Sequence, residues 1–181
     1  MKIIETPLND VVILEPKIFG DDRGFFFENF NLKKFQELTG VTDDFVQDNH
    51  SKSQQSVLRG LHYQTRQTQG KLVRVIEGEI YDVAVDIREN SSTFGQTFGL
   101  LLNAKTHQQL WVPKGFAHGF VVTSETAQVL YKTTDYYAPE YEQSILWNDK
   151  DLNIQWPLAG KEPLLSAKDK QGKRFKDAEY L

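Results

Sequence analysis

The hydrophobic positions of the chain fall in short runs that alternate with polar residues and are separated by Gly, Asn, Asp and Pro. This pattern is typical of β-strands joined by turns. The runs are VVIL at 11–14, FFFENF at 25–30, KLVRVIEGEIYDVAVDI at 71–87 and AQVLYKTTDYY at 127–137. Many short strands predict an all-β fold, either a sandwich or a jelly-roll barrel, and such a barrel can hold a small ligand in its mouth.

Two elements can be predicted in more detail. In the run 71–87, Glu77-Gly78 interrupts two alternating segments, which predicts a hairpin whose second strand has Asp82 and Asp86 on one face and apolar residues on the other. A surface helix is expected over 31–39, because Asn31 can cap its first turn and Gly40 can end it.

Composition limits the classes of function. A chain of 181 residues suits one domain, residues 1–181, and only the charged tail after about residue 170 lacks a strand pattern and is expected to be loosely held. The net charge of −4 argues against a nucleic-acid partner, so local cations must hold any anionic ligand. The absence of cysteine fits a reducing compartment, for which the cytoplasm is expected, and no run reaches the roughly 18 apolar residues of a membrane span.

Two of the four histidines raise the question of a metal site. The segment PKGFAH at 113–118 reads P-x-G-x-x-H, which resembles the second half of the cupin signature, whose histidine is a metal ligand. The first half requires a second histidine two residues after His62, where this chain has Gln64, and an amide is a poor ligand for a transition metal. We therefore expect no metal; taken singly, His62 and His118 also fit hydrogen-bonded core residues.

Longer segments carry a second resemblance. They are IFGDDRGFFFENF at 18–30, FVQDNHSKSQQSVLRGLHYQ at 45–64, QGKLVRVIEGEIYDVAVDIR at 69–88, LWVPKGFAHGF at 110–120, the surroundings of Tyr131, SILWND at 144–149 and SAKD at 166–169. Together they resemble the dTDP-4-dehydrorhamnose 3,5-epimerase family. The resemblance implies a cupin-like jelly roll without metal or other cofactor, a thymidine-diphosphate 4-keto-6-deoxyhexose as substrate, its 3,5-epimer as product, and a role in the formation of dTDP-L-rhamnose.

The chemistry of that reaction explains which residues matter. Inversion of a carbon next to a ketone requires a base, a group that stabilises the enolate oxygen, and an acid on the opposite face. An imidazole such as His62 suits the base, since it titrates near neutrality. The resemblance assigns Asp169 as the carboxylate partner of His62, Lys71 to the enolate and Tyr131 to the acid. The sequence pattern alone also fits structural roles for these three residues. Asp169 can be a solvated acid or a helix cap, Lys71 can be a cation at the end of a strand, and Tyr131 can be a half-buried aromatic residue of a strand.

The resemblance also implies a set of substrate-binding residues: Arg23, Glu28, Gln47, Asp48, Asn49, Arg59, Lys71, His118, Glu142 and Lys168. Strand alternation puts Gln47 and Asn49 on one face, whereas Asp48 points away or contributes its backbone. Arg23 also suits a surface ion pair with its acidic neighbours. Aromatic side chains that can stack on thymine or pack in the core are Phe26, Tyr136 and Tyr137.

One conflict remains between pattern and resemblance. Alternation puts Arg59 and His62 on opposite faces of a strand, although both are expected at one substrate. Either a bulge at Gly60 resets the alternation, or Arg59 serves a neighbouring subunit. The resemblance implies a homodimer in which strands of one subunit extend the sheet of its partner.

Three other functions stay open: an epimerase that inverts one carbon or uses another nucleotide-sugar, a metal-dependent cupin enzyme, and a sugar-binding barrel without catalysis. Gln64 disfavours the second of these, and Tyr131 favours inversion at both carbons.

Overall fold

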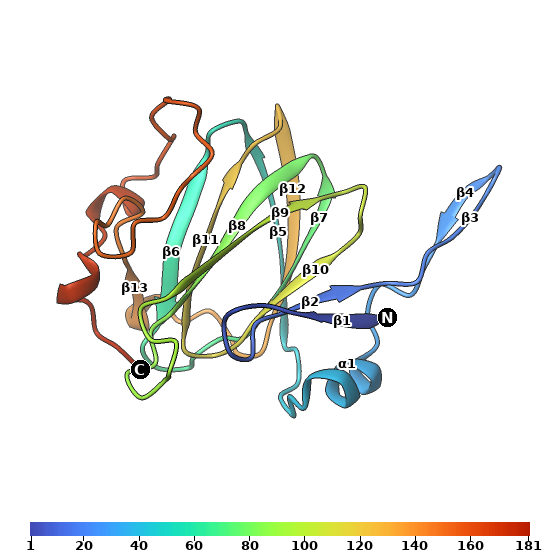
Figure 1. Cartoon of the computed structure of the whole chain (residues 1–181), viewed down its shortest axis with the longest axis horizontal. Coiled ribbons are helices and arrows are strands. Elements are labelled where there is room, and N and C mark those ends of the chain that lie inside the picture. Colours follow the sequence, from blue (N-terminus) through green and yellow to red (C-terminus); the bar gives the residue numbers. More distant parts are fainter.

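The computed structural model describes residues 1–181 and is dominated by antiparallel strands in two facing sheets (Figure 1). The larger sheet contains, in spatial order, β1 (Lys2–Glu5), β2 (Val12–Glu15), β10 (Gln109–Val112), β7 (Lys71–Glu77), β12 (Thr126–Thr133) and β5 (Gln47–Gln54). The smaller sheet contains β13 (Glu142–Ser144), β6 (Leu58–Gln64), β11 (Phe116–Val122), β8 (Glu79–Asp86) and β9 (Thr97–Asn103). The prediction of an all-β jelly roll is confirmed, although the two sheets are not joined by hydrogen bonds into a closed barrel.

The space between the sheets holds the largest hydrophobic core, in which Val73 and Val75 of β7 meet Ile80 and Ala84 of β8. Each sheet is also covered on its outer face. The five-stranded sheet carries a second core that includes Val83. The buried strands therefore present apolar side chains on both faces, and the polar side chains that remain between the sheets require an explanation.

The predicted helix is present as α1 (Leu32–Thr39). The side chain of Asn31 accepts a hydrogen bond from the backbone N–H of Lys34 at 3.1 Å, and Gly40 ends the helix in the left-handed conformation at φ 72°. Phe35 is fully buried and stacks edge-on against Trp111 on the outer face of the six-stranded sheet. No helix of the structure is both long and apolar enough to cross a membrane.

The predicted hairpin at 71–87 is wrong. Strand β7 pairs with β10 and β12 in one sheet, whereas β8 pairs with β11 and β9 in the other. Gly78 turns the chain from one sheet to the next with φ 74°, and a side chain there would collide with the carbonyl oxygen of Thr126. Alternation detects both strands but contains no information on which neighbours each strand acquires.

Residues 18–26 form an arm that leaves the body of the protein (Figure 1). Strands β3 (Phe19–Asp21) and β4 (Gly24–Phe26) pair only with each other, so the predicted strand at 25–30 ends early, at Phe26. Phe25 and Phe26 are 61% and 74% exposed. Such exposed aromatic side chains are expected to bind another surface.

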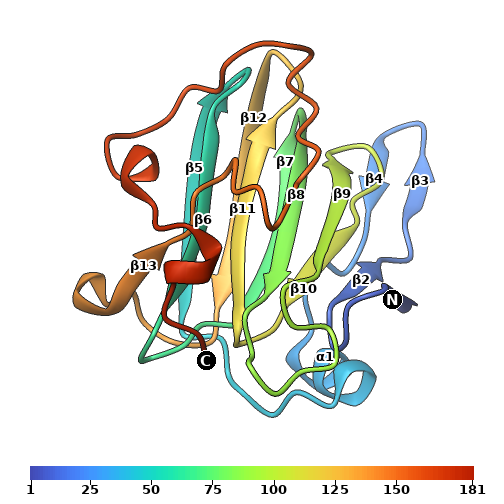
Figure 2. The ribbon, with the colours of Figure 1, turned by 60° about the vertical axis from the view of Figure 1, so that its left-hand side comes forward.

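The C-terminal segment lies across the outer face of the five-stranded sheet (Figure 2). The last part of the chain contains three short 3₁₀ helices, η1 (Pro139–Tyr141), η2 (Asp169–Gln171) and η3 (Phe175–Asp177). The last residue is Leu181. The backbone N–H of Leu181 donates to Ile87 at 3.0 Å, and its carbonyl accepts from Glu89 at 2.9 Å. The residues after 170, expected to be loosely held, are therefore packed against β8 and its following turn.

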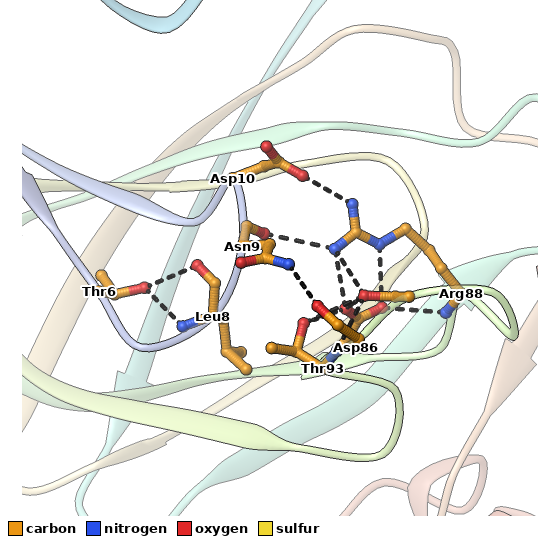
Figure 3. A network of polar contacts seen from close by, with 9 residues as sticks. Thr6, Leu8, Asn9, Asp10, Asp86, Arg88 and Thr93 are labelled. Atoms are coloured by element: carbon orange, nitrogen blue, oxygen red, sulfur yellow. Dashed lines mark hydrogen bonds and ion pairs between the residues drawn. The ribbon is translucent and has the colours of Figure 1, made fainter.

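A polar network joins the end of β8 to the β1–β2 loop (Figure 3). Arg88 donates to the fully buried Asp86 through Nε at 2.9 Å and Nη2 at 2.8 Å, and through Nη1 to Asp10 at 2.9 Å. Thr93 donates to the same carboxylate at 2.7 Å. Both carboxylate oxygens of Asp86 therefore accept hydrogen bonds from side chains of this network, which explains why a buried carboxylate is tolerated there.

Candidate active site

A cavity of about 450 Å³ opens between the two sheets. It brings together every predicted site residue except Arg23, Glu28 and Asp48. Its lining consists of Gln47, Asn49, Ser51, Arg59, His62, Tyr63, Gln64, Gln69, Lys71, His118, Phe120, Tyr131, Tyr137, Glu142, Ser166, Lys168 and Asp169. A cavity of this size, with many polar groups turned inward, suits a polar small molecule.

His62 and Asp169 form a dyad. Nε2 of His62 lies 2.6 Å from Oδ1 of Asp169, whose other oxygen accepts a hydrogen bond from Ser166 at 2.6 Å. Burial works to raise the pKa of Asp169, but the hydrogen bonds from His62 and Ser166 outweigh it and lower that pKa below its usual range. An ionised carboxylate fixes the proton of His62 on Nε2 and leaves Nδ1 free to accept a proton.

A bulge at Gly60 brings Arg59 to the same cavity as His62. In the pairing of β6 with β11, His118 lies opposite His62 and Phe120 lies opposite Arg59. The chain advances three residues on β6 but only two on β11 between these pairs, so β6 contains one extra residue. Gly60 has φ 127°, and a side chain there would collide with Gly119. The bulge predicted as one of two alternatives is confirmed, and Arg59 lines the cavity of its own chain.

Lys71 and Tyr131 line the cavity from the six-stranded sheet, opposite the dyad. Nζ of Lys71 donates to the backbone carbonyl of His62 at 3.4 Å. Burial lowers the pKa of Lys71 to about 8, against the attraction of Glu142 and Asp82. Burial also raises the pKa of Tyr131, although the charge of Arg59 opposes this. The cavity thus contains a cation that can lose its proton near neutrality and a phenol that keeps its own.

Three further charged or aromatic side chains that line the cavity contact one another. Glu142 forms an ion pair with Lys168 and accepts a hydrogen bond from the hydroxyl of Tyr137 at 2.5 Å. These contacts lower the pKa of Glu142 despite its burial. Tyr137 is 52% exposed and lines the cavity, so its ring is available to a ligand and is not a core side chain.

Alternation along β5 correctly separates its side chains. Gln47 and Asn49 line the cavity and are joined by a hydrogen bond of 3.0 Å. Asp48 lies on the outer face, where it forms an ion pair with Lys132 at 2.9 Å. The carboxylate of Asp48 is therefore outside the cavity, as alternation predicts, and a binding role of Asp48 through its backbone stays a prediction.

Arg23 and Glu28 are also outside this cavity. Arg23 lies at the tip of the β3–β4 hairpin, and Glu28 lies in the segment between this hairpin and α1. The Arg23 side chain is 90% exposed and forms the predicted surface ion pair with Asp21 at 2.5 Å. Glu28 forms an ion pair with Lys34 at 2.7 Å.

Sequence reasoning missed two partners. Asp82 lies 2.6 Å from Nε2 of His118 and is fully buried, and Ser166 orients Asp169. The signal for Ser166 was its position three residues before Asp169. The signal for Asp82 was an acid between Ile80 and Ala84 on one face of a predicted strand.

The side-chain donors offer little to a metal ion. No group of three or more His, Cys, Asp or Glu side chains is arranged to hold one. Gln64, at the position where a cupin would have its second histidine, donates to the carbonyl of Gln67 at 2.6 Å and accepts from the N–H of Ala138 at 2.9 Å. Its amide is thus engaged by backbone groups.

Comparisons with known proteins agree with this geometry. A family model described as dTDP-4-dehydrorhamnose 3,5-epimerase matches residues 5–177. The chain is 59% identical to the dTDP-4-dehydrorhamnose 3,5-epimerase of Pseudomonas aeruginosa over 179 residues, which cover 99% of this chain and 98% of the relative. It is also similar to the solved dTDP-6-deoxy-D-glucose-3,5-epimerase of Legionella pneumophila in complex with dTDP-4-keto-L-rhamnose, with a TM-score of 0.95, 55% identity, and coverage of 98% and 94%. The chain therefore belongs to the dTDP-4-dehydrorhamnose 3,5-epimerase family.

Proposed function

We propose that the chain converts dTDP-4-dehydro-6-deoxy-D-glucose to dTDP-4-dehydro-L-rhamnose by inverting C3 and C5 of the sugar. One observation carries the proposal: the His62–Asp169 dyad belongs to one wall of the cavity, and Tyr131 belongs to the opposite wall. A sugar ring between the walls exposes one face to a base and the other to an acid, which is what inversion requires.

Each inversion is a proton exchange. His62 removes the hydrogen next to the C4 ketone through Nδ1, and the electron pair of the broken C–H bond moves to the ketone oxygen. Lys71 and His118 stabilise the enolate that forms, and Tyr131 returns a proton from the other face. Asp169 stabilises the imidazolium meanwhile. No electron is gained or lost, so the reaction needs no redox cofactor, and Lys71 and His118 supply the stabilisation of the enolate that a metal ion would otherwise give.

The nucleotide is assigned to charged and aromatic side chains that line the cavity. Arg59 and Lys168 offer the cations that a diphosphate requires in a chain of net charge −4. Glu142 is suited to hydroxyl or N–H donors of the ligand, and the exposed ring of Tyr137 to stacking on thymine. The amides of Gln47 and Asn49 offer further hydrogen-bond partners to the ligand.

The cytoplasm is the compartment we propose, because the chain lacks cysteine.

The proposed function is tested by turnover of dTDP-4-keto-6-deoxyglucose in D₂O. We expect the wild type to incorporate deuterium at C3 and C5. Tyr131→Phe should still incorporate deuterium, because the base is intact, but should form inverted product about 10²–10⁴-fold more slowly. NMR of the sugar distinguishes label from inversion. Tyr81→Phe, on the outer face of β8, is the control.

The outcomes separate the alternative functions. Label at one carbon alone would favour the epimerase of a single centre. Bound substrate without label at either carbon would contradict catalysis and favour the sugar-binding barrel. A transition metal that is required for turnover would contradict the proton chemistry proposed for His62.

We further propose that the protein is a homodimer in which Arg23 and Glu28 act in the cavity of the partner. Neither residue lines the cavity of its own chain, and the arm that carries Arg23 and leads to Glu28 projects from the body with Phe25 and Phe26 exposed (Figure 1). A single chain gains nothing from such an arm, whereas a symmetric dimer can bury it twice.

Mixed dimers test this arrangement. Arg23→Ala alone should weaken substrate binding about 10–100-fold, because a charge-assisted contact is lost. When Arg23→Ala and His62→Ala chains are unfolded and refolded together, half of the dimers contain both chains, and each has one complete site. At substrate concentrations far below KM, where each parent variant is nearly inactive, about a quarter of the wild-type rate should therefore return. If Arg23 acts within its own chain, the mixture should show no recovery.

A further inference from the structure

Asp82 is a buried acid that the proposed proton transfers leave unused. It lies on the face of β8 that points between the sheets, flanked on that face by Ile80 and Ala84. All three side chains are fully buried. A carboxylate in such surroundings lowers the free energy of the fold only if cations or donors compensate for its lost hydration.

The contacts of Asp82 point to the cavity. Its Oδ1 lies 2.6 Å from Nε2 of His118, which is the single hydrogen-bond partner of this carboxylate, and Oδ2 is buried without any partner. Asp86, four residues later on the same face, differs because its carboxylate is fully engaged by Arg88, Ser91 and Thr93 (Figure 3). Asp82 therefore lacks the structural network that explains Asp86.

His118 connects Asp82 to the ligand. It is 7% exposed and lines the cavity, while its Nε2 is occupied by the carboxylate. A carboxylate accepts but does not donate, so the proton of this contact belongs to Nε2. Only Nδ1 is then left for a ligand, as in metal sites where a carboxylate orients the histidine.

The charge of Asp82 also acts on the second group assigned to the enolate. The pKa of Lys71 is lowered mainly by burial, and Glu142 and Asp82 are the carboxylates that oppose this effect. The other charged and titratable side chains that line the cavity are Arg59, His62, Tyr63, His118, Tyr131, Tyr137, Lys168 and Asp169.

We propose that Asp82 is a positioning residue of the epimerase, which holds His118 with Nδ1 toward the ketone oxygen. This inference rests on the proposed function. Asp82 does not contact the substrate. It acts through His118, which is one of the groups assigned to the enolate. The His118–Asp82 pair thus repeats the arrangement of His62–Asp169 in a different role, because one dyad moves the proton and the other supports the oxygen.

The first test needs neither substrate nor mutation of Asp82. Long-range ¹H–¹⁵N NMR spectra of the ligand-free wild type report which nitrogen of each imidazole carries a proton, and His118→Gln assigns the signal. We expect His118 to be protonated on Nε2, with this proton protected from exchange with solvent. A proton on Nδ1 alone would overturn the proposal, whatever the enzyme catalyses.

The second test compares Asp82→Asn with Asp86→Asn, which each remove one buried carboxylate from the same face of β8. Asp82→Asn should lower kcat about 10–100-fold with little change in KM, and should shift the NMR signals of His118. Asp86→Asn should lower Tm but leave kcat and His118 unchanged. Wild-type kcat in Asp82→Asn, or equal loss in both variants, would overturn the proposal. If the wild type itself exchanges no deuterium, the proposed function fails, and the NMR result still decides whether Asp82 orients His118.

Discussion

We expect His62→Ala to abolish the exchange of the C3 and C5 hydrogens with solvent deuterium and to lower kcat about 10²–10⁴-fold. Of the cavity histidines only His118 remains, and the place proposed for its Nδ1 is at the enolate oxygen and not at the C3 and C5 hydrogens. Asp169 retains its hydrogen bond from Ser166, so the cavity wall should persist without the imidazole.

The control for this variant is His50→Ala. His50 lies on the outer side of β5 and contacts Gln128 at 2.8 Å, away from the cavity. The His50→Ala variant should have the kcat of the wild type. Rapid exchange at C3 and C5 in a His62→Ala protein of unchanged Tm would remove His62 from the role of base, and the search for a base would then turn to Glu142.

Local patterns predicted the local parts of the fold. The cap at Asn31 and the glycine at 40 set the helix limits because both effects act within one turn. Alternation separated Asp48 from Gln47 and Asn49, since neighbouring side chains on a strand point to opposite faces. The hairpin at 71–87 failed for a different reason: β7 pairs with β10 and β12 in one sheet and β8 with β9 and β11 in the other, and local alternation carries no information on this division.

The site was predicted to the extent that its residues belong to recognisable segments. The resemblance brought His62 and Asp169 together across 107 residues, a distance in sequence that no periodicity covers. Asp82 was missed because its meaning depends on the pairing of β8 with β11, which carries His118. The location of Arg23 outside the cavity was equally unreadable, since it depends on where the arm leaves the body.

Lys71 supports the second large prediction. Its half-buried side chain reaches the backbone carbonyl of His62 at 3.4 Å, and the enolate of the proposed reaction requires a positive charge at this point. Lys71→Met keeps the length of the side chain and removes the charge, and we expect kcat/KM to fall about 10²–10³-fold. Lys52→Met, which removes an exposed lysine from β5, should have no effect on kcat/KM.

The pH profile identifies the charge as the cause. Because burial lowers the pKa of Lys71 to about 8, the ammonium is present below that pH and is lost as the pH rises through it. The kcat/KM of the wild type should therefore decline above about pH 8. Tyr131 does not account for this decline, since burial raises its pKa and keeps its proton in place. In Lys71→Met the residual activity should lose the decline; a variant that keeps it would show that another group titrates there and that Lys71 does not carry the charge the enolate needs.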